Sequence, residues 1–303
     1  MFSDWIFSRK CNSDRYIVIK IKIYKKLKLK QKIISQMKKS TFYICQYIFL
    51  LLLIIGVLPA YAEDFVSNSF NTTGQVKILP VTQTCTGTPW QHIVWVHVHD
   101  NEETARQTAL MALNQIQQGC LLDFRHGGSR EIRIQTNEVN YHFDPNRIFT
   151  ETGRKNALKC LRGNCVQARE ELTQEVDSFL NQYMIHAKLI VALHNNHPSG
   201  LSIRNYVPGG SMAQGMSQVA VSPDKDPHDF FYVTSQRAFE FLSRRNFNVV
   251  LQNNQTVRDD GSLSVWAARQ EIDYINSEAG TGNLASQMVM LAAVWAYMQE
   301  YYL

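Results

Sequence analysis

The chain alternates short apolar runs with longer segments whose apolar residues recur at helical spacing. Residues 92–98 and 188–193 are apolar runs of strand length, which is typical of buried strands. Residues 102–118 carry Ala, Leu and Ile at helical spacing, which predicts an amphipathic helix that Gly119 ends. Strands are expected at residues 92–98, 120–125, 130–136, 188–193, 230–232, 248–252 and 272–277, with a first edge strand near 76–81, and helices at 102–118, 166–183, 235–245 and 284–302.

Strands that alternate with helices indicate an α/β fold, with a mostly parallel or mixed central sheet and helices on both faces. Loops are expected at residues 141–150 around Pro145 and at 195–215, and a turn at 259–264. No repeat or linker divides residues 63–303, so this stretch is expected to form a single domain.

The first 62 residues are expected to lie outside that domain. Residues 42–61 are strongly apolar, Met37-Lys38-Lys39 precedes them, and Ala60-Tyr61-Ala62 ends the run. A basic start, a short apolar stretch and an A-x-A end predict a signal peptide at 37–62, cleaved after Ala62. A membrane anchor is the alternative, but a spanning helix needs about 20 apolar residues and no cleavage site. Residues 1–36 are expected to be an upstream extension, with Met37 as the initiator.

Charge follows the same division. The whole chain carries +5, but residues 1–62 hold 12 of the 31 Lys and Arg and only 2 of the 26 Asp and Glu. The remainder is therefore net −5, and nothing in it argues for a nucleic-acid partner. We expect a secreted or periplasmic protein that meets the membrane only through its signal peptide.

Four cysteines follow the signal peptide, and an even number in an exported chain predicts disulfides. Cys160 and Cys165 flank a Gly-Asn turn and form the first expected pair, which leaves Cys85 to pair with Cys120. A cysteine-based zinc site is the less favoured alternative, because no C-x-x-C pair exists.

The candidate chemistry begins with His99, Glu102 and His194. His99 and Glu102 are three residues apart after one predicted strand, and His194 follows another. Two histidines and one carboxylate suit a catalytic zinc ion, because three protein ligands leave a fourth position open. The carboxyl ends of strands are also where α/β enzymes form their sites.

Three further segments carry residue types that such a hydrolase needs. Asn146 and Arg147 lie side by side in a loop, and arginine binds carboxylates through two parallel hydrogen bonds. Glu278 ends a predicted strand and could act as a general base. Arg133, in preference to Arg130, is expected to stabilise a developing oxyanion.

The order His99-x-x-Glu102, Asp144-x-Asn146-Arg147, His194, Glu278 resembles the zinc carboxypeptidase superfamily, which includes carboxypeptidase A-like enzymes and the succinylglutamate desuccinylase/aspartoacylase deacylases. The resemblance covers roughly residues 90–300. It implies that His99, Glu102 and His194 bind zinc, that Asn146 and Arg147 bind a substrate carboxylate, and that Glu278 is the general base. The substrate-covering tyrosine of carboxypeptidases has two candidates, Tyr206 and Tyr232.

Other polar residues near these motifs have structural interpretations. His97 shares a strand face with His99, but Glu102 is the better ligand. His197 is expected in the loop after His194, where it is either solvated or lines the substrate site. Asp100 could orient a ligand histidine, but an N-cap of the following helix is favoured.

The favoured function is therefore an exported zinc-dependent hydrolase that cleaves an amide bond beside a free carboxylate. Peptides, including cell-wall peptides, are the expected substrates of such a metallocarboxypeptidase. An N-acyl amino acid deacylase would use the same residues. An inactive binding module on the same fold is the third hypothesis, which Glu278 argues against.

Overall fold

The computed structural model describes residues 78–136 and 138–303, all within Asn68–Leu303, one of the two units into which the chain divides. The predicted extension and signal peptide at 1–62 lie outside the described residues. Among the helices described, none is both long and apolar enough to cross a membrane.

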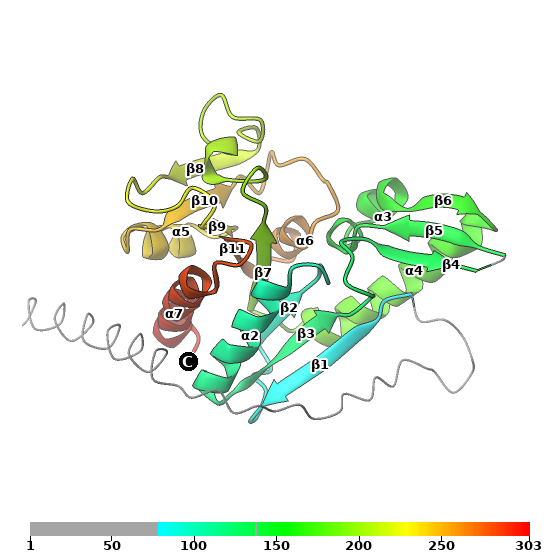
Figure 1. The fold of residues 1–303 in the computed structure, drawn as a ribbon, viewed down its shortest axis with the longest axis horizontal. Coiled ribbons are helices and arrows are strands. Elements are labelled where there is room, and N and C mark those ends of the chain that lie inside the picture. The colour runs from blue at the N-terminus through cyan, green and yellow to red at the C-terminus, as the bar shows by residue number, and fades with distance from the viewer. Residues whose placement is uncertain (1–77, 137) are drawn as a thin grey trace, which may run out of the picture. The chain divides into compact units, whose positions relative to one another are not determined.

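An eight-stranded mixed sheet forms the centre of the described unit (Figure 1). Its strands, in spatial order, are β1 (Val81–Thr86), β3 (Gly119–Phe124), β2 (Ile93–His97), β7 (Leu189–Asn196), β11 (Asp273–Gly280), β9 (Phe230–Val233), β10 (Asn248–Gln252) and β8 (Met216–Ala220). Strands β3, β2, β7 and β11 run parallel, whereas β1, β9 and β8 each pair antiparallel with a neighbour. The α/β prediction with a mixed sheet is confirmed.

The two central strands extend further than their apolar runs predict. All eight residues of β7 are buried, and β11 is buried except at its two ends. Both faces of a central strand are covered, so its side chains need no alternation. The polar residues Asn195 and Asn196, expected in a loop, continue β7, and His194 and Glu278 therefore lie inside strands.

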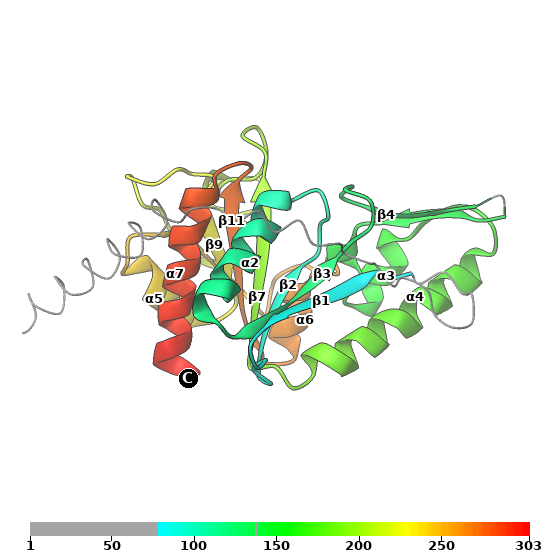
Figure 2. The same ribbon diagram turned by 60° about the horizontal axis from the view of Figure 1, so that its bottom comes forward.

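Helices cover both faces of the sheet, as predicted (Figure 2). On one face lie α2 (Glu103–Ile116), α5 (Gln236–Ser243) and α7 (Leu284–Tyr301); on the other lie α4 (Cys165–Phe179) and α6 (Leu263–Arg269). Helix α2 buries a stripe of small residues that includes Ala105, Ala109 and Ala112, and it packs beside α7. Helix α6 was not predicted, and it begins at Leu263, near the end of the turn expected at residues 259–264.

A second sheet was not predicted. It is antiparallel and contains β4 (Ile132–Gln135), β5 (Asn140–Phe143) and β6 (Lys159–Arg162) (Figure 1). Helix α3 (Glu151–Ala157) lies between β5 and β6 in the chain and contacts α4. The loop expected at residues 141–150 is partly wrong, because Tyr141 and Phe143 alternate into the core from β5. The sequence Asn140-Tyr141-His142-Phe143 does alternate polar and apolar residues, but the run is only four residues long.

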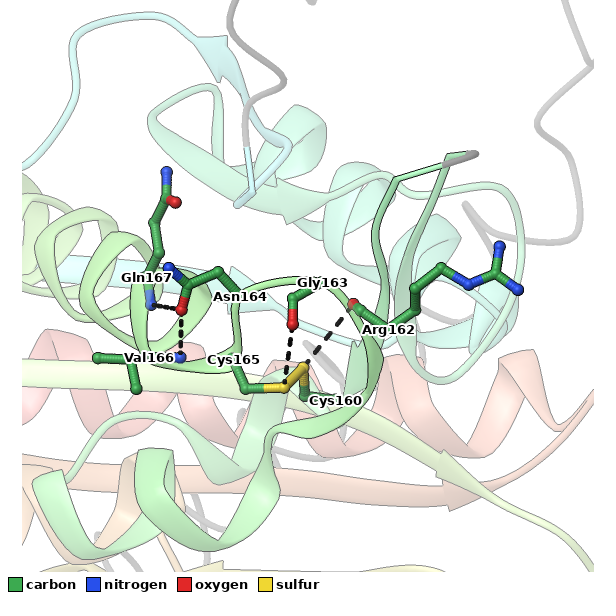
Figure 3. Close-up of a disulfide and its surroundings, with 7 residues drawn as sticks. All are labelled: Cys160, Arg162, Gly163, Asn164, Cys165, Val166 and Gln167. Carbon is green, nitrogen blue, oxygen red and sulfur yellow. Dashed lines mark hydrogen bonds between the residues drawn. A yellow bond between two sulfur atoms is a disulfide. The ribbon is translucent and has the colours of Figure 1, made fainter.

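Both predicted disulfides are present. Cys85 and Cys120 are register partners on β1 and β3, and their bond ties the edge strand to the sheet. Cys160, in β6, and Cys165, the first residue of α4, form the second bond (Figure 3). Asn164, inside this loop, caps α4 by accepting hydrogen bonds from two backbone N–H groups of its first turn.

Candidate metal centre

His99, Glu102 and His194 converge at one edge of the main sheet. Strands β2 and β7 are parallel neighbours, so the segments at their carboxyl ends meet there. His99 follows β2, Glu102 precedes α2, and His194 lies near the end of β7. The tight turn between the first two is held by a hydrogen bond from the Glu102 N–H to the His99 carbonyl, 2.9 Å long.

The three side chains are buried and point at a common centre. The Nδ1 atoms of His99 and His194 are 3.1 Å apart, and each lies 2.9 Å from an oxygen of Glu102. Among the described residues, this is the only group of three or more His, Cys, Asp or Glu side chains whose donor atoms could share a metal ion. Burial opposes ionisation of Glu102, but the charge and hydrogen bond of His194 outweigh it, so the pKa of Glu102 lies below its usual value.

Asp144 fixes the orientation of His99. Its Oδ1 lies 2.8 Å from Nε2 of His99 and also accepts a hydrogen bond from the backbone N–H of Asn146. Burial opposes the ionised form, but the contact with His99 holds the pKa of Asp144 below its usual range. With Nε2 engaged by a carboxylate, Nδ1 of His99 is the nitrogen left to act as a ligand.

Arg130, rather than Arg133, reaches this cluster. Nη1 of Arg130 lies 3.0 Å from Oε1 of Glu102, and Nη2 lies 3.2 Å from Asp144. Arg133 is 63% exposed and pairs with Glu131 at 2.8 Å. In β4 the alternate residues Ile132 and Ile134 point inward, so Arg133 must point outward. The preference for Arg133 is therefore corrected in favour of Arg130.

Glu278 lies beside the cluster on the neighbouring strand. It is the register partner of His194 across β7 and β11 and is buried. The side-chain amides of Asn276 and Asn196 donate to its two oxygens at 3.1 and 3.4 Å. Burial raises the pKa of Glu278, the negative charge of Glu102 adds to this rise, and the charge of His194 and the two amides oppose it.

Two other carboxylates, Glu271 and Asp273, precede Glu278 on the same segment of the sequence. Glu271 is exposed, and Asp273 pairs with Arg237 at the opposite end of β11. Glu278 is therefore the carboxylate of this segment that lies near the histidines.

Asn146 and Arg147 lie on a short turn, Pro145–Arg147, whose first residue follows Asp144. Oδ1 of Asn146 accepts a hydrogen bond from the backbone N–H of Leu263, 3.2 Å long. Arg147 is partly exposed and pairs with Asp260. The turn thus connects the residue that orients His99 with the proposed substrate anchor.

The two candidate tyrosines belong to a buried aromatic group. The ring centroids of Tyr206 and Tyr232 are 5.7 Å apart, and Tyr206 also packs against Phe230. The hydroxyl of Tyr232 is committed to Gln252 at 3.0 Å. Burial raises the pKa of Tyr206, and the charge of Glu278 raises it further, whereas Arg147 lowers it. The Tyr206 phenol is therefore within electrostatic range of both Glu278 and Arg147.

Asp100 has neither of the roles weighed for it. Its Oδ2 accepts hydrogen bonds from the backbone N–H groups of His126 and Gly128 at 2.6 and 2.8 Å, and Arg125 lies 2.6 Å from Oδ1. Glu102 occupies the N-cap position of α2 without a side-chain capping bond. Asp100 thus fixes the turn that leads toward Arg130, and the N-cap prediction is wrong.

His97 and His197 are placed as expected. His97 is fully buried, lies 2.8 Å from Asp123 and contacts the carbonyl of Glu102 at 3.1 Å, so it supports the cluster from behind. The side chain of His197 is exposed and forms a hydrogen bond with Ser199.

A buried amide pair behind His194 was missed by sequence reasoning. Asn195 donates its backbone N–H to Glu102 at 3.1 Å, and its side chain bonds to Gln287 at 3.0 Å. Gln287 in turn donates to the carbonyl of His194, also at 3.0 Å. The available signal was a glutamine within the otherwise apolar sequence of α7, since a fully buried polar side chain needs partners.

No protein-family model matches this chain, and a search of curated proteins also found no match. Solved structures give distant likenesses. Murein-tripeptide amidase MpaA from Escherichia coli O157 is 13% identical, with 69% of this chain and 82% of that chain covered and a TM-score of 0.35. For bovine thrombin-activatable fibrinolysis inhibitor, in complex with tick carboxypeptidase inhibitor, the values are 11%, 73%, 90% and 0.40.

An aspartoacylase family protein from Mesorhizobium loti is 13% identical, with 71% of this chain covered and a TM-score of 0.40. This chain spans only 59% of that protein's length. Identities and TM-scores this low transfer no residue role to this chain.

Proposed function

We propose that this chain is an exported, zinc-dependent hydrolase that cleaves an amide bond beside a free carboxylate, and that it acts on peptides as a metallocarboxypeptidase. One observation carries the proposal. Two imidazole nitrogens and a carboxylate converge at the sheet edge, and a second buried carboxylate, Glu278, lies on the next strand.

The donor set fits zinc. The Nδ1 atoms of His99 and His194 lie 3.1 Å apart, and each faces an oxygen of Glu102, so the three donor atoms could share one cation. Nitrogen and oxygen donors in a set of three match catalytic zinc sites, and Asp144 supplies the carboxylate that orients a ligand histidine. His99, Glu102 and His194 would hold the ion.

When bound, zinc would polarise the substrate carbonyl and lower the pKa of water toward about 7. Glu278 would take a proton from the attacking water and pass it to the leaving amine, because its pKa is raised by burial. The Asn276 and Asn196 amides would keep its two oxygens oriented.

Two arginines would act on the substrate's oxygens. Arg130 would donate hydrogen bonds to the oxyanion that develops on the carbonyl. Arg147 would bind the free carboxylate and so place the scissile bond between the cluster and Glu278. Export is supported by the two disulfides, since such bonds persist in oxidising compartments.

The test combines metal content with end-group analysis. Purified protein should carry about one zinc and should release the last residue from N-blocked peptides with a free C-terminus, but not from their amidated forms. Release of acyl groups from N-acyl amino acids instead would make it a deacylase. No turnover of either class would favour a binding module.

Glu278→Gln separates chemistry from binding in the same assay. The amide keeps the size of the side chain but cannot accept the proton, so kcat should fall by about 100- to 10,000-fold while zinc is retained. Glu271→Gln, an exposed position at the far end of the same strand segment, is the matched control and should keep full activity. An unchanged kcat in Glu278→Gln would remove this residue as the base.

A further inference from the structure

The amide side chains of Asn195 and Gln287 form a buried network next to the candidate metal centre. Gln287 lies near the start of α7 and is fully buried, and Asn195 is on β7, directly after a ligand histidine. The ladder between β2 and β7 stops at Val96 and Ala192. Beyond that point, the backbone N–H of Asn195 donates to the carboxylate of Glu102, 3.1 Å away. A side-chain network therefore takes over where the pairing of these two strands ends.

Asn195 also caps the helix that Glu102 precedes. Its Oδ1 accepts a hydrogen bond from the backbone N–H of Ala105, the third residue of α2, at 2.6 Å. The side chain of the N-cap residue usually accepts this bond. Glu102 occupies the N-cap position but makes no such bond. Because Asn195 supplies the cap from β7, the carboxylate of Glu102 is left to face the two histidines.

Gln287 connects the strand that carries a ligand to the strand that carries the proposed base. Its Nε2 donates to the carbonyl of His194 at 3.0 Å and to the carbonyl of Ser277 at 3.3 Å. Ser277 precedes Glu278, and Glu278 is the register partner of His194. One amide group thus holds the backbone of both strands at the point where the ligand and the base lie.

The direction of both amides is fixed by their partners. Oε1 of Gln287 accepts a hydrogen bond from Nδ2 of Asn195 at 3.0 Å, and the same Nδ2 donates to the carbonyl of Ala279 at 3.3 Å. If either amide were turned over, donors would face donors and acceptors would face acceptors at these contacts. The network is therefore rigid, and it adds no charge beside the metal centre.

We infer that Gln287 is a positioning residue for the metal centre and for the reaction. It acts through Asn195 and through the backbone of His194, without touching metal or substrate. It holds Glu102 and His194 in one arrangement before a metal binds, and it holds His194 at a set distance from Glu278. The inference rests on the proposed function. The competing interpretation is a purely structural amide, whose loss would lower stability and leave metal binding unchanged.

The experiment replaces Gln287 by methionine, which keeps the length of the side chain and removes the amide. Competition with a fluorescent chelator measures zinc affinity, and the visible absorption of the cobalt-substituted protein reports the geometry of the ligands. We expect zinc affinity to fall by about 10- to 100-fold, with an altered cobalt spectrum, because the loss of a contact that orients a ligand has this effect. At saturating zinc, kcat should fall by about tenfold or more, since the ligand and the base are no longer held together. KM should stay near the wild-type value, because the Arg147 anchor is untouched.

Asn248→Leu is the matched control. Asn248 is a buried amide on β10 with the same pattern of bonds. Its Nδ2 donates to the carbonyls of Asp226 and Asp229, and its Oδ1 accepts from the backbone N–H of Ser222. None of these partners belongs to the metal cluster. Both substitutions should lower the free energy of unfolding of the metal-free protein by similar amounts in urea, whereas only Gln287→Met should change zinc affinity and the cobalt spectrum.

Two results would overturn the inference. One is a zinc affinity within twofold of the wild type, with an unchanged cobalt spectrum, in Gln287→Met. The other is an equal loss of affinity in Gln287→Met and Asn248→Leu, because affinity would then follow stability alone. If Gln287→Met does not fold, Gln287→Asn replaces it, since this variant keeps the amide but withdraws it by one methylene. The same outcomes apply to it.

The proposed function fails in a different way. A wild type that binds zinc but hydrolyses no peptide would refute the reaction, while zinc affinity and the cobalt spectrum would still decide the role of Gln287. A wild type that binds neither zinc nor cobalt would overturn the inference together with the metal site.

Discussion

Asp144 sets the chemistry of a histidine that lies 45 residues away in the chain. A carboxylate 2.8 Å from Nε2 of His99 fixes both the ring orientation and the nitrogen that faces Glu102 and His194. Such contacts determine how firmly a metal is held as much as the ligands do, because a freely rotating ring loses entropy on binding.

We therefore predict that Asp144→Ala weakens zinc affinity by about 10- to 100-fold, although Asp144 is not itself a ligand. Competition with a fluorescent zinc chelator measures this directly. Asp177→Asn, which removes an exposed carboxylate on α4, serves as the control. A zinc affinity within twofold of the wild type would show that the Asp144–His99 contact does not orient the ligand.

At the scale of elements, two loops far apart in the sequence build the anchor by direct backbone contact. The Pro145–Arg147 turn and the segment before α6 meet at Gly261, where a side chain has no room. The hydrogen bond from the Leu263 N–H to Asn146 closes the same contact.

Gly261→Ala should therefore destabilise the fold and displace Arg147. Its Cβ would meet the Arg147 carbonyl at 2.2 Å and Gly153 at 2.6 Å, in addition to the cost of a positive φ. Gly209→Ala is the matched control, because Gly209 has a φ of +86° and no atom within 4 Å of the added Cβ. In urea unfolding, we expect the control to lower the free energy of unfolding by about 1 kcal/mol and Gly261→Ala to lower it by about 2–4 kcal/mol. Equal costs for the two variants would show that the contact relaxes.

At the scale of the whole molecule, the two disulfides constrain loops of very different length. Cys85–Cys120 spans 35 positions and fixes the edge strand β1, whereas Cys160–Cys165 spans 5. In the chain-entropy view, the stabilisation grows with the length of the closed loop.

Replacing Cys85 and Cys120 together by alanine should lower the free energy of unfolding by about 4 kcal/mol, and replacing Cys160 and Cys165 by about 2 kcal/mol. Chemical denaturation of the two double variants beside the oxidised wild type gives the comparison. The reverse order of the two losses would contradict the loop-length argument and point to strain or to structure in the unfolded chain.

The sequence by itself determined the features that are encoded locally. Apolar runs located the central strands, helical spacing located α2, α4, α5 and α7, and cysteine spacing gave both disulfide pairs. The histidines and carboxylates of the candidate centre were also found, because they follow apolar runs whose ends must meet at one edge of a parallel sheet.

Only the tertiary structure decided which of several equivalent residues reaches that centre. Arg130 and Arg133 are three positions apart, and the outward face of β4 excludes Arg133. Asp100 and Asp144 are both acids near a ligand, yet Asp144 alone contacts His99. Asp260 pairs with Arg147 only because its loop packs against the backbone of Arg147 at Gly261. Periodicity and residue type describe a segment, whereas these choices depend on distances between side chains on separate segments, which packing alone sets.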